Sequence, residues 1–442
     1  MNNRILFATD VPFWNASTGA EQRILGIHRF LVRQGKTCGV FYLGELSDVD
    51  QKLVADRELK VFASASYQQP EKLLNRVKWY ADATINQART WLSRTDCSIL
   101  APEGPASLTL DEFEWPWAIT RFEEVVESFH PNAIIFEYIK MAYLQKAIPD
   151  AKQLTITTLV DTHDVLHRRA EQFFTNGFPH WLKIDRKQEA EVLCQFDGVI
   201  AIQEKEAALF RSMVGDAAEV ITAGHAVEKK STEPVIIKDE AVEKVTVGYI
   251  GSKNFSNWQA IREFLNCAWP AVLHKHKGSC DLVIAGEICD WFDKDAEGNL
   301  VAADNDFPDA NRVAQFNADA LQDVNLLGRI DDVEQFYDQI DVVINPVQFG
   351  TGLKIKNAES LRYGKLLITT TNGFDGMPEA TRLACMVVED VNEMGLAINS
   401  ICNDLSKIRR MQKLALELSQ TEFSESQAYQ ELLRFLDSRQ TA

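Results

Sequence analysis

Short apolar runs alternate along most of the chain with segments whose apolar residues recur at helical spacing. The apolar runs predict buried strands at 4–9, 37–43, 133–138, 154–160, 198–202, 220–222, 245–250, 281–285, 324–327, 341–345, 366–371 and 384–388. The periodic segments predict helices at 20–33, 71–94, 188–194, 203–214, 258–267, 332–339, 353–363, 396–420 and 427–436. Strands that alternate with helices are typical of α/β proteins with parallel sheets.

Two features of this pattern predict the domain organisation. The first strand, helix and strand form a βαβ unit, which predicts a Rossmann-like domain at the N-terminus. Residues 228–241 are charged and lack a helical period, so they predict a linker to a second domain. A chain of 442 residues is long enough for two or three domains that each bury a core.

Composition narrows the class of protein. Apolar residues make up 46% of the chain and charged residues 25%, as in ordinary soluble globular proteins. We expect a cytoplasmic protein, because no signal peptide precedes the first strand and no apolar run has the length of a transmembrane segment. The eight cysteines are scattered without a C-x-x-C pair, which favours reduced thiols over disulfides or a zinc site.

The net charge of −18 argues against nucleic acid, or an anionic bilayer, as a broad electrostatic partner. A local basic patch is compatible with this charge, so peripheral contact with a membrane stays open.

The stretch 340–377 carries the strongest chemical signal. A glycine-bearing loop, Gly350 to Gly352 with Thr351 between them, joins an apolar strand to a helix, where free N–H groups and the helix dipole favour an anion. Lys354 and Lys356 add positive charge in the first turn, and Glu359 follows about two turns after the loop. The pattern indicates a diphosphate beside the loop and a ribose beside the glutamate. The alternative is a pair of surface lysines and a solvated glutamate on an ordinary helix.

Two places in the first half of the chain are further candidates. Ser17, Thr18 and Gly19 supply hydroxyls and close backbone approach at a helix N-terminus, where one hydroxyl could equally be a helix cap. His163 follows a buried strand and lies between Asp161 and Asp164, so it could donate to a substrate hydroxyl. A capping histidine is the alternative, and a metal site is disfavoured because no second histidine accompanies it.

Three weaker signals complete the set. Ser252 lies in a glycine turn after the strand at 245–250, where it could approach a phosphate. Trp115 or Trp117 could line an acceptor groove, although such aromatics more often belong to a satellite core. Residues 293–304 have some likeness to a calcium loop, but a hairpin-like insertion explains them better because position twelve lacks the bidentate glutamate.

These motifs resemble those of the family 4 glycosyltransferases, which are retaining enzymes of the GT-B fold. Gly350, Gly352, Lys354, Lys356 and Glu359 match a G-x-G-x-K-x-K-x-x-E signature. The departures are Ser360 in place of alanine, Leu366 in place of proline, and Thr351 where many members have a first glutamate. Matches are clearest at 1–35, 159–224 and 245–377.

The resemblance implies an α/β fold with two facing Rossmann-like domains and a cleft between them. It implies an acceptor-side domain at 1–227, a donor domain at 240–424 and a C-terminal helix, 425–442, that packs back on the first domain. The donor would be a nucleotide-diphosphate sugar and the acceptor a glycan, a lipid-linked molecule or another hydroxyl compound, with neither a metal nor a cofactor.

By the same resemblance, the diphosphate would contact Gly350, Thr351, Gly352, Lys354 and Lys356, with help from Ser252. Glu359 would hold the ribose, and His163 and the loop at Gly19 would hold the donor sugar. Two other functions stay open: a sugar-nucleotide epimerase of the same fold, which needs no acceptor, and a non-catalytic sugar-binding or scaffold protein. The donor base, the sugar and the acceptor are not identified by the sequence.

Overall fold

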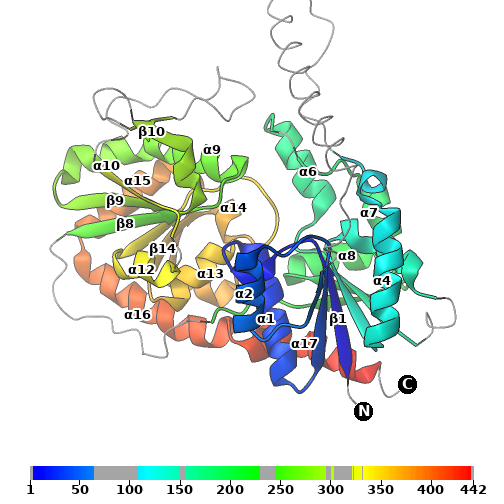
Figure 1. Cartoon of the computed structure of the whole chain (residues 1–442). Helices are drawn as coiled ribbons and strands as arrows, with labels where there is room; N and C mark the ends of the chain where they lie inside the picture. Colours follow the sequence, from blue (N-terminus) through cyan, green and yellow to red (C-terminus); the bar gives the residue numbers. More distant parts are fainter. Residues whose placement is uncertain are drawn as a thin grey trace, which may run out of the picture. The chain divides into compact units, whose positions relative to one another are not determined.

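The computed structural model describes residues 3–63, 108–149, 155–178, 180–228, 244–294, 300–302, 321, 323–330 and 332–439. The chain divides into two compact units (Figure 1). The first unit holds Met1–Ala16, Ala20–Ala223 and Glu431–Ala442, and the second holds Ser17–Gly19 and Gly224–Gln430.

The first unit is built on a seven-stranded parallel sheet with strand order β3-β2-β1-β4-β5-β6-β7. Its strands are β1 Arg4–Thr9, β2 Thr37–Tyr42, β3 Val61–Ala63, β4 Ala133–Glu137, β5 Thr157–Asp161, β6 Gly198–Ala201 and β7 Glu219–Thr222. Its helices are α1 Gly19–Arg33, α2 Asp48–Asp56, α4 Pro116–Phe129, α6 Leu166–Thr175, α7 Arg186–Leu193 and α8 Glu204–Val214, with 3-10 turns η1 Phe13–Asn15, η2 Leu110–Phe113 and η3 Ile139–Ala147.

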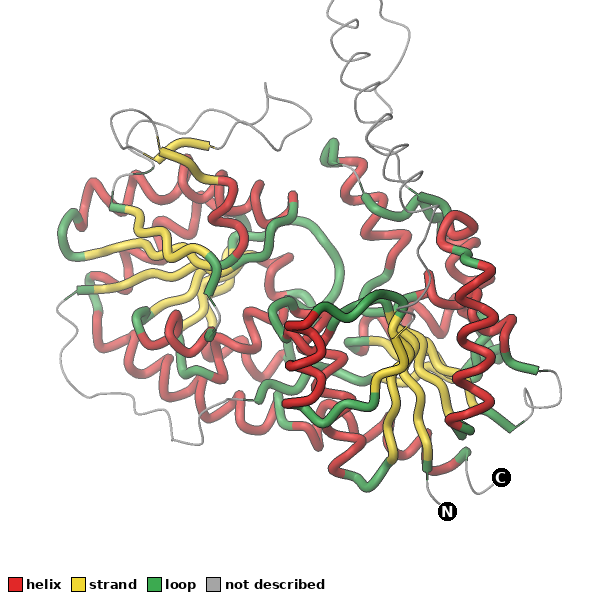
Figure 2. Tube along the Cα trace, in the orientation of Figure 1, coloured by secondary structure: helices red, strands yellow, loops and turns green. Residues whose placement is uncertain are grey.

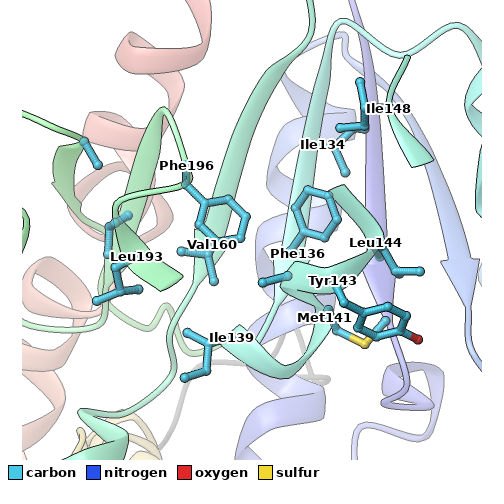
Figure 3. Close-up of a cluster of buried hydrophobic side chains, with 14 of the residues drawn as sticks. Ile134, Phe136, Ile139, Met141, Tyr143, Leu144, Ile148, Val160, Leu193 and Phe196 are labelled. Atoms are coloured by element: carbon cyan, nitrogen blue, oxygen red, sulfur yellow. The ribbon is translucent and has the colours of Figure 1, made fainter. Parts of the chain in front are cut away.

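The core of this unit lies between the sheet and its helices because the central strands are apolar on both faces. Every residue of β4 and all but the first of β1 are buried. Figure 3 shows Phe136 of β4 and Val160 of β5 beside Phe196, and the two phenylalanine rings pack with centroids 5.5 Å apart. Because the middle of these strands is buried on both faces, polar side chains that could meet a ligand lie at the strand ends.

The second unit contains a six-stranded parallel sheet with order β12-β9-β8-β13-β14-β15. Its strands are β8 Val245–Ile250, β9 Cys280–Ala285, β12 Val324–Gly328, β13 Val342–Asn345, β14 Leu366–Thr370 and β15 Cys385–Val388. Its helices are α9 Phe255–Glu263, α10 Trp269–His276, α12 Val333–Asp338, α13 Ile355–Arg362, α14 Thr371–Phe374, α15 Val391–Cys402 and α16 Leu405–Glu422, with short turns η4 Phe264–Ala268, η5 Glu287–Trp291 and η6 Glu379–Ala384. The last helix, α17 Glu425–Ser438, has residues in both units.

Helices cover both faces of each sheet (Figure 2). In the second unit α10 and α15 pack together, and α13 packs on α16. The fold class is therefore confirmed as α/β with two parallel, Rossmann-like sheets. No helix in the described ranges is both long and apolar enough to cross a membrane.

Two expected helices have different limits in the structure. The single helix expected at 396–420 is two helices, because Asp404 accepts a hydrogen bond from the Lys407 N–H and starts α16 anew. The helix expected at 258–267 begins earlier, at the Asn254 cap, and continues through the π-helical turn η4 into α10. The helices α2, α4 and α6 were not predicted.

Other predictions have mixed outcomes. The hairpin expected near 293–304 is present, as β10 Phe292–Lys294 pairs antiparallel with β11 Leu300–Ala302. The remaining residues of the proposed calcium loop lie outside the described residues, as do the helix expected at 71–94 and nearly all of the linker expected at 228–241. The βαβ unit around α13 is confirmed, since β13 and β14 are parallel neighbours.

Candidate functional site

Two loops meet at the carboxyl edge of the second unit's sheet. β8 has β9 on one side and β13 on the other, so the loops after β8 and β13 lie at a point where the chain order reverses. In open α/β sheets this is where ligands bind. The Ser256 hydroxyl joins the two loops, because it donates to the Phe349 carbonyl at 3.0 Å.

The loop after β13 has a conformation that glycine favours. Gly350 has φ of 109° and Gly352 has φ of 78°, both in the left-handed range that side chains with a Cβ avoid. The Lys354 Nζ folds back over this loop and donates to the carbonyls of Gly350, Thr351 and Gly352 at 3.2, 2.9 and 2.9 Å. Thus the loop's own carbonyls offset the charge of Lys354 without a bound anion, which the sequence pattern did not predict.

Lys356 is the more unusual of the two lysines. Its ammonium donates to Asn257 Oδ1 at 2.9 Å, lies 3.5 Å from the Tyr249 hydroxyl, and sits 4.7 Å from the centre of the Tyr249 ring. All of these partners are neutral, and burial together with the nearby Lys354 lowers the pKa of Lys356 to about 7. A half-buried lysine with neutral hydrogen-bond partners is poised to bind an anion, because an anion would favour its charged form.

Glu359 lies within the same helix, almost fully buried. Its charge favours the charged form of Lys356, and the Tyr337 hydroxyl donates to its Oε2 at 3.5 Å. Tyr337 in turn stacks on Tyr363, with ring centroids 4.3 Å apart. The carboxylate is therefore bonded to one member of a stacked tyrosine pair.

Buried amides fix the position of α13. Asn345, at the end of β13, donates to Asn357 Oδ1 at 2.8 Å, and the Asn357 amide donates to the Gly373 carbonyl at 2.7 Å. The structure describes no side-chain cap on α13. Neither asparagine was predicted, although an asparagine inside a helix and another ending an apolar strand were visible signals.

Ser252 is tied into the loop after β8. Its hydroxyl accepts hydrogen bonds from the amides of Asn254 and Asn257, at 3.0 and 3.2 Å. Since Asn257 also accepts from Lys356, one amide connects Ser252 to the lysine. Within the second unit the structure thus brings together Ser252, Gly350, Thr351, Gly352, Lys354, Lys356 and Glu359.

His163 lies in the first unit, after β5, with a φ of 59°. Its Nε2 is 2.7 Å from Oε2 of Glu137, a fully buried carboxylate at the end of β4, and its ring stacks on Tyr138 at a centroid distance of 4.0 Å. Burial raises the pKa of Glu137. The polar contacts of the ring to described residues run through Nε2, which also lies 3.9 Å from Oδ2 of Asp161.

The neighbouring carboxylate belongs to an ion pair. Arg23, on α1, donates from Nε and Nη2 to the two oxygens of Asp161, at 2.8 and 2.9 Å, and both side chains are fully buried. Glu137, Asp161 and His163 offer ligand atoms within 4.8 Å of one another. A metal ion would have to displace the guanidinium, so the donor set fits an ion-pair network better than a metal centre.

The remaining predicted residues are Gly19, Trp115 and Trp117. Gly19 is the first residue of α1 and belongs to the second unit. Trp115 and Trp117 are partly buried against the core of the first unit, as the satellite-core alternative predicts. Glu137, Arg23 and Tyr249 were not predicted as site residues, because their partners are distant in the sequence.

Comparisons with known proteins bear on the family and the fold. Residues 244–404, most of the second unit, match the family model described as Glycosyl transferases group 1. No curated protein sequence matches the chain.

Solved structures match over the whole length. The sucrose-phosphate synthase of Thermosynechococcus elongatus has a TM-score of 0.66 at 13% identity and is covered completely, as is this chain. HepE of Anabaena, in complex with UDP-glucose, has a TM-score of 0.62 at 13% identity, over 98% of this chain and 99% of its own. A mutant of TarM from S. aureus, in complex with fondaparinux, α-GlcNAc-glycerol and UDP, has a TM-score of 0.63 at 10% identity, over 98% of this chain and all of its own. At these identities the likeness establishes the fold, which is GT-B.

Proposed function

We propose that this chain is a retaining, family 4-like glycosyltransferase that transfers a sugar from a nucleotide-diphosphate sugar to a hydroxyl of an acceptor. The observation that carries the proposal is the loop and helix of 350–359, where two glycines with positive φ precede a half-buried lysine with neutral hydrogen-bond partners. The match of 244–404 to Glycosyl transferases group 1, and the uridine nucleotides bound by HepE and TarM, support it.

Each residue has a distinct task in this proposal. Lys356, the backbone of Gly350 to Gly352 and the start of α13 hold the diphosphate and offset the charge that develops as it leaves. Lys354 exchanges its carbonyl partners for phosphate oxygens, and Ser252 adds a hydroxyl. Glu359 accepts from ribose hydroxyls, while His163 Nδ1 and the loop at Gly19 contact the donor sugar.

These groups would supply the positive charge without a metal or cofactor, and the acceptor would be a glycan or lipid-linked molecule. Calorimetric titration of UDP and GDP into the protein in EDTA tests the first step. We expect saturable binding of at least one, with a crystal soak placing the diphosphate at Lys356. Density for the diphosphate at another place would contradict the proposal.

Turnover separates the alternatives. We expect the protein, incubated with candidate nucleotide sugars in EDTA, to release nucleoside diphosphate slowly by hydrolysis. The rate of release should rise when a glycan or lipid-linked acceptor is added. A new sugar nucleotide formed from donor alone would identify an epimerase. Binding without turnover or hydrolysis of any donor would identify a non-catalytic sugar-binding protein.

A further inference from the structure

One ammonium group in the first unit is surrounded by aromatic rings. The Lys140 Nζ lies 5.5 Å from the ring centre of Tyr138, 5.9 Å from that of Phe113 and 5.3 Å from that of Trp181. It also pairs with Asp10, with 2.6 Å between Nζ and Oδ2. These five residues are called the Lys140 cluster below.

The cluster lies where α/β sheets place ligands. Asp10 directly follows β1, while Tyr138 and Lys140 follow β4, and these two strands are neighbours in the sheet. Tyr138 stacks on His163 and makes an edge contact with Trp181, whose ring centroid is 6.2 Å away. Two ring contacts therefore connect Trp181 to the histidine that we assign to the donor sugar.

Parts of the cluster remain available to a ligand. Trp181 is 37% exposed, although tryptophans in a structural core are mostly covered. Asp10 Oδ1 and the hydroxyl of the neighbouring Tyr143 are buried atoms without a hydrogen-bond partner among the described residues. Unpartnered buried oxygens are uncommon and call for a ligand or water.

We infer that the Lys140 cluster is a carbohydrate subsite for the acceptor, with a sugar ring stacked on Trp181 and its hydroxyls bonded to Asp10 and Lys140. This inference rests on the proposed function and gives the acceptor a chemical class. An indole offers a broad apolar surface for the C–H face of a sugar, and an adjoining carboxylate and ammonium accept from and donate to its hydroxyls. A lipid chain would gain nothing from the charged pair, which it would have to desolvate.

Saturation-transfer NMR tests the inference with the full chain and four probes: the methyl glycosides of glucose, galactose, mannose and N-acetylglucosamine. We expect at least one to bind with millimolar affinity and its ring protons to receive the transfer. Trp181→Ala should weaken that binding about 5- to 10-fold, and Trp181→Phe should restore part of it. Phe174→Ala is the matched control, because Phe174 is a 45% exposed aromatic of the same unit outside the cluster.

Lys140→Gln tests the polar half separately and decides the matter if Trp181→Ala does not fold, as judged by circular dichroism. Weaker binding in that variant supports the subsite. Unchanged binding in the folded variants, or binding of none of the four glycosides to the wild type, overturns the inference. UDP titration of the same samples separates the two proposals: if UDP binds while the sugar results are negative, the acceptor subsite fails and the proposed function stands.

Discussion

Lys356 is a cation whose hydrogen-bond partners are both neutral, while Lys354 and Glu359 act on it with opposite charges. Its amide and phenol partners stabilise an ammonium less than a carboxylate would, and burial disfavours the charged form. The residue therefore costs stability in the free protein, and a bound anion would reverse that cost. This combination is more specific to a binding site than the glycines or Lys354 alone.

Replacing Lys356 by methionine should stabilise the free protein and weaken nucleotide binding. The variant removes a half-buried charge whose hydrogen-bond partners are neutral, so we expect the free energy of unfolding at pH 7 to rise by roughly 1–3 kcal/mol. UDP affinity should fall at least tenfold, or by about 1.4 kcal/mol. Urea denaturation and calorimetry measure the two effects. Arg362→Met is the control, because Arg362 lies at the other end of the same helix from the glycine loop. Loss of stability in Lys356→Met would contradict the interpretation.

The same lysine makes UDP binding depend on pH. Its pKa is about 7 in the free protein, and a bound diphosphate would raise it, so binding takes up a proton above that pH. Affinity should fall as pH rises from 7 to about 9, by up to tenfold per pH unit. Lys356→Met should flatten this profile; an equally steep profile in the variant would assign the proton to another group.

Glu137 controls His163 through one hydrogen bond. When Glu137 accepts the hydrogen of Nε2, the neutral ring carries no hydrogen on Nδ1, so Nδ1 can accept a hydrogen bond from a substrate hydroxyl. When both ring nitrogens are protonated, Nδ1 donates to that hydroxyl instead. Glu137→Gln should lower the rate of sugar transfer about tenfold or more, because His163 is then no longer held in one tautomer by a carboxylate. The affinity for UDP should change little. The facing groups Arg23 and Asp161 keep their own ion pair in the variant.

Steady-state kinetics against pH tests the role of Glu137. The acid limb of the wild-type profile should shift in Glu137→Gln, because a titrating carboxylate has been removed from the histidine. Glu206→Gln, another buried carboxylate of the first unit, should leave the profile in place. A slower enzyme with an unshifted profile would indicate a purely structural contribution.

At the scale of elements, the loop between β13 and α13 depends on glycine geometry. Gly352→Ala should cost about 1–2 kcal/mol of stability, because alanine is strained at its φ of 78°. It should also weaken UDP binding severalfold by displacing the backbone. Gly35 has the same φ of 78° with open space around it, so Gly35→Ala should cost similar stability without affecting UDP. Equal UDP affinity in the two variants would contradict a phosphate role for the loop.

Most strands were predictable from the sequence because parallel strands are buried on both faces and form short apolar runs. The short strand β3 was not predicted, and its three residues are only half-buried. Helix ends were less predictable, since they depend on single caps such as Asp404 and Asn254. The break between α15 and α16 follows from one aspartate within a long helical pattern. The turn η4 arises where a continuous helix meets Pro270, which has no N–H to donate.

At the scale of the whole molecule, the site residues also fall into those that the sequence predicted and those that it did not. Gly350, Gly352, Lys354, Lys356 and Glu359 are close in the sequence, so a local pattern revealed them. The bond from Glu137 to His163 requires that β4 and β5 pair, and the contact of Lys356 with Asn257 requires that β8 and β13 pair. No local pattern encodes a pairing between strands, so those partners became visible only in the fold.

The final helix, α17, contributes to the cores of both units, and this gives a prediction about their stability. Within the second unit, the Tyr429 hydroxyl accepts from the Ala226 N–H at 3.1 Å. Further along, Phe435 is buried in the first unit, where its ring would lie 3.0 Å from a Cβ at Gly198 of β6, and Lys36 pairs with Asp437.

Phe435→Ala should destabilise the first unit by about 3–5 kcal/mol through the cavity it leaves. Amide hydrogen exchange followed by mass spectrometry should show faster exchange in β1 and β6 and little change in β8 and β13. Phe174→Ala, an exposed aromatic in the same unit, should change neither set. Equal acceleration in all four strands would mean that the two units unfold as one, since then a cavity in one core would open both.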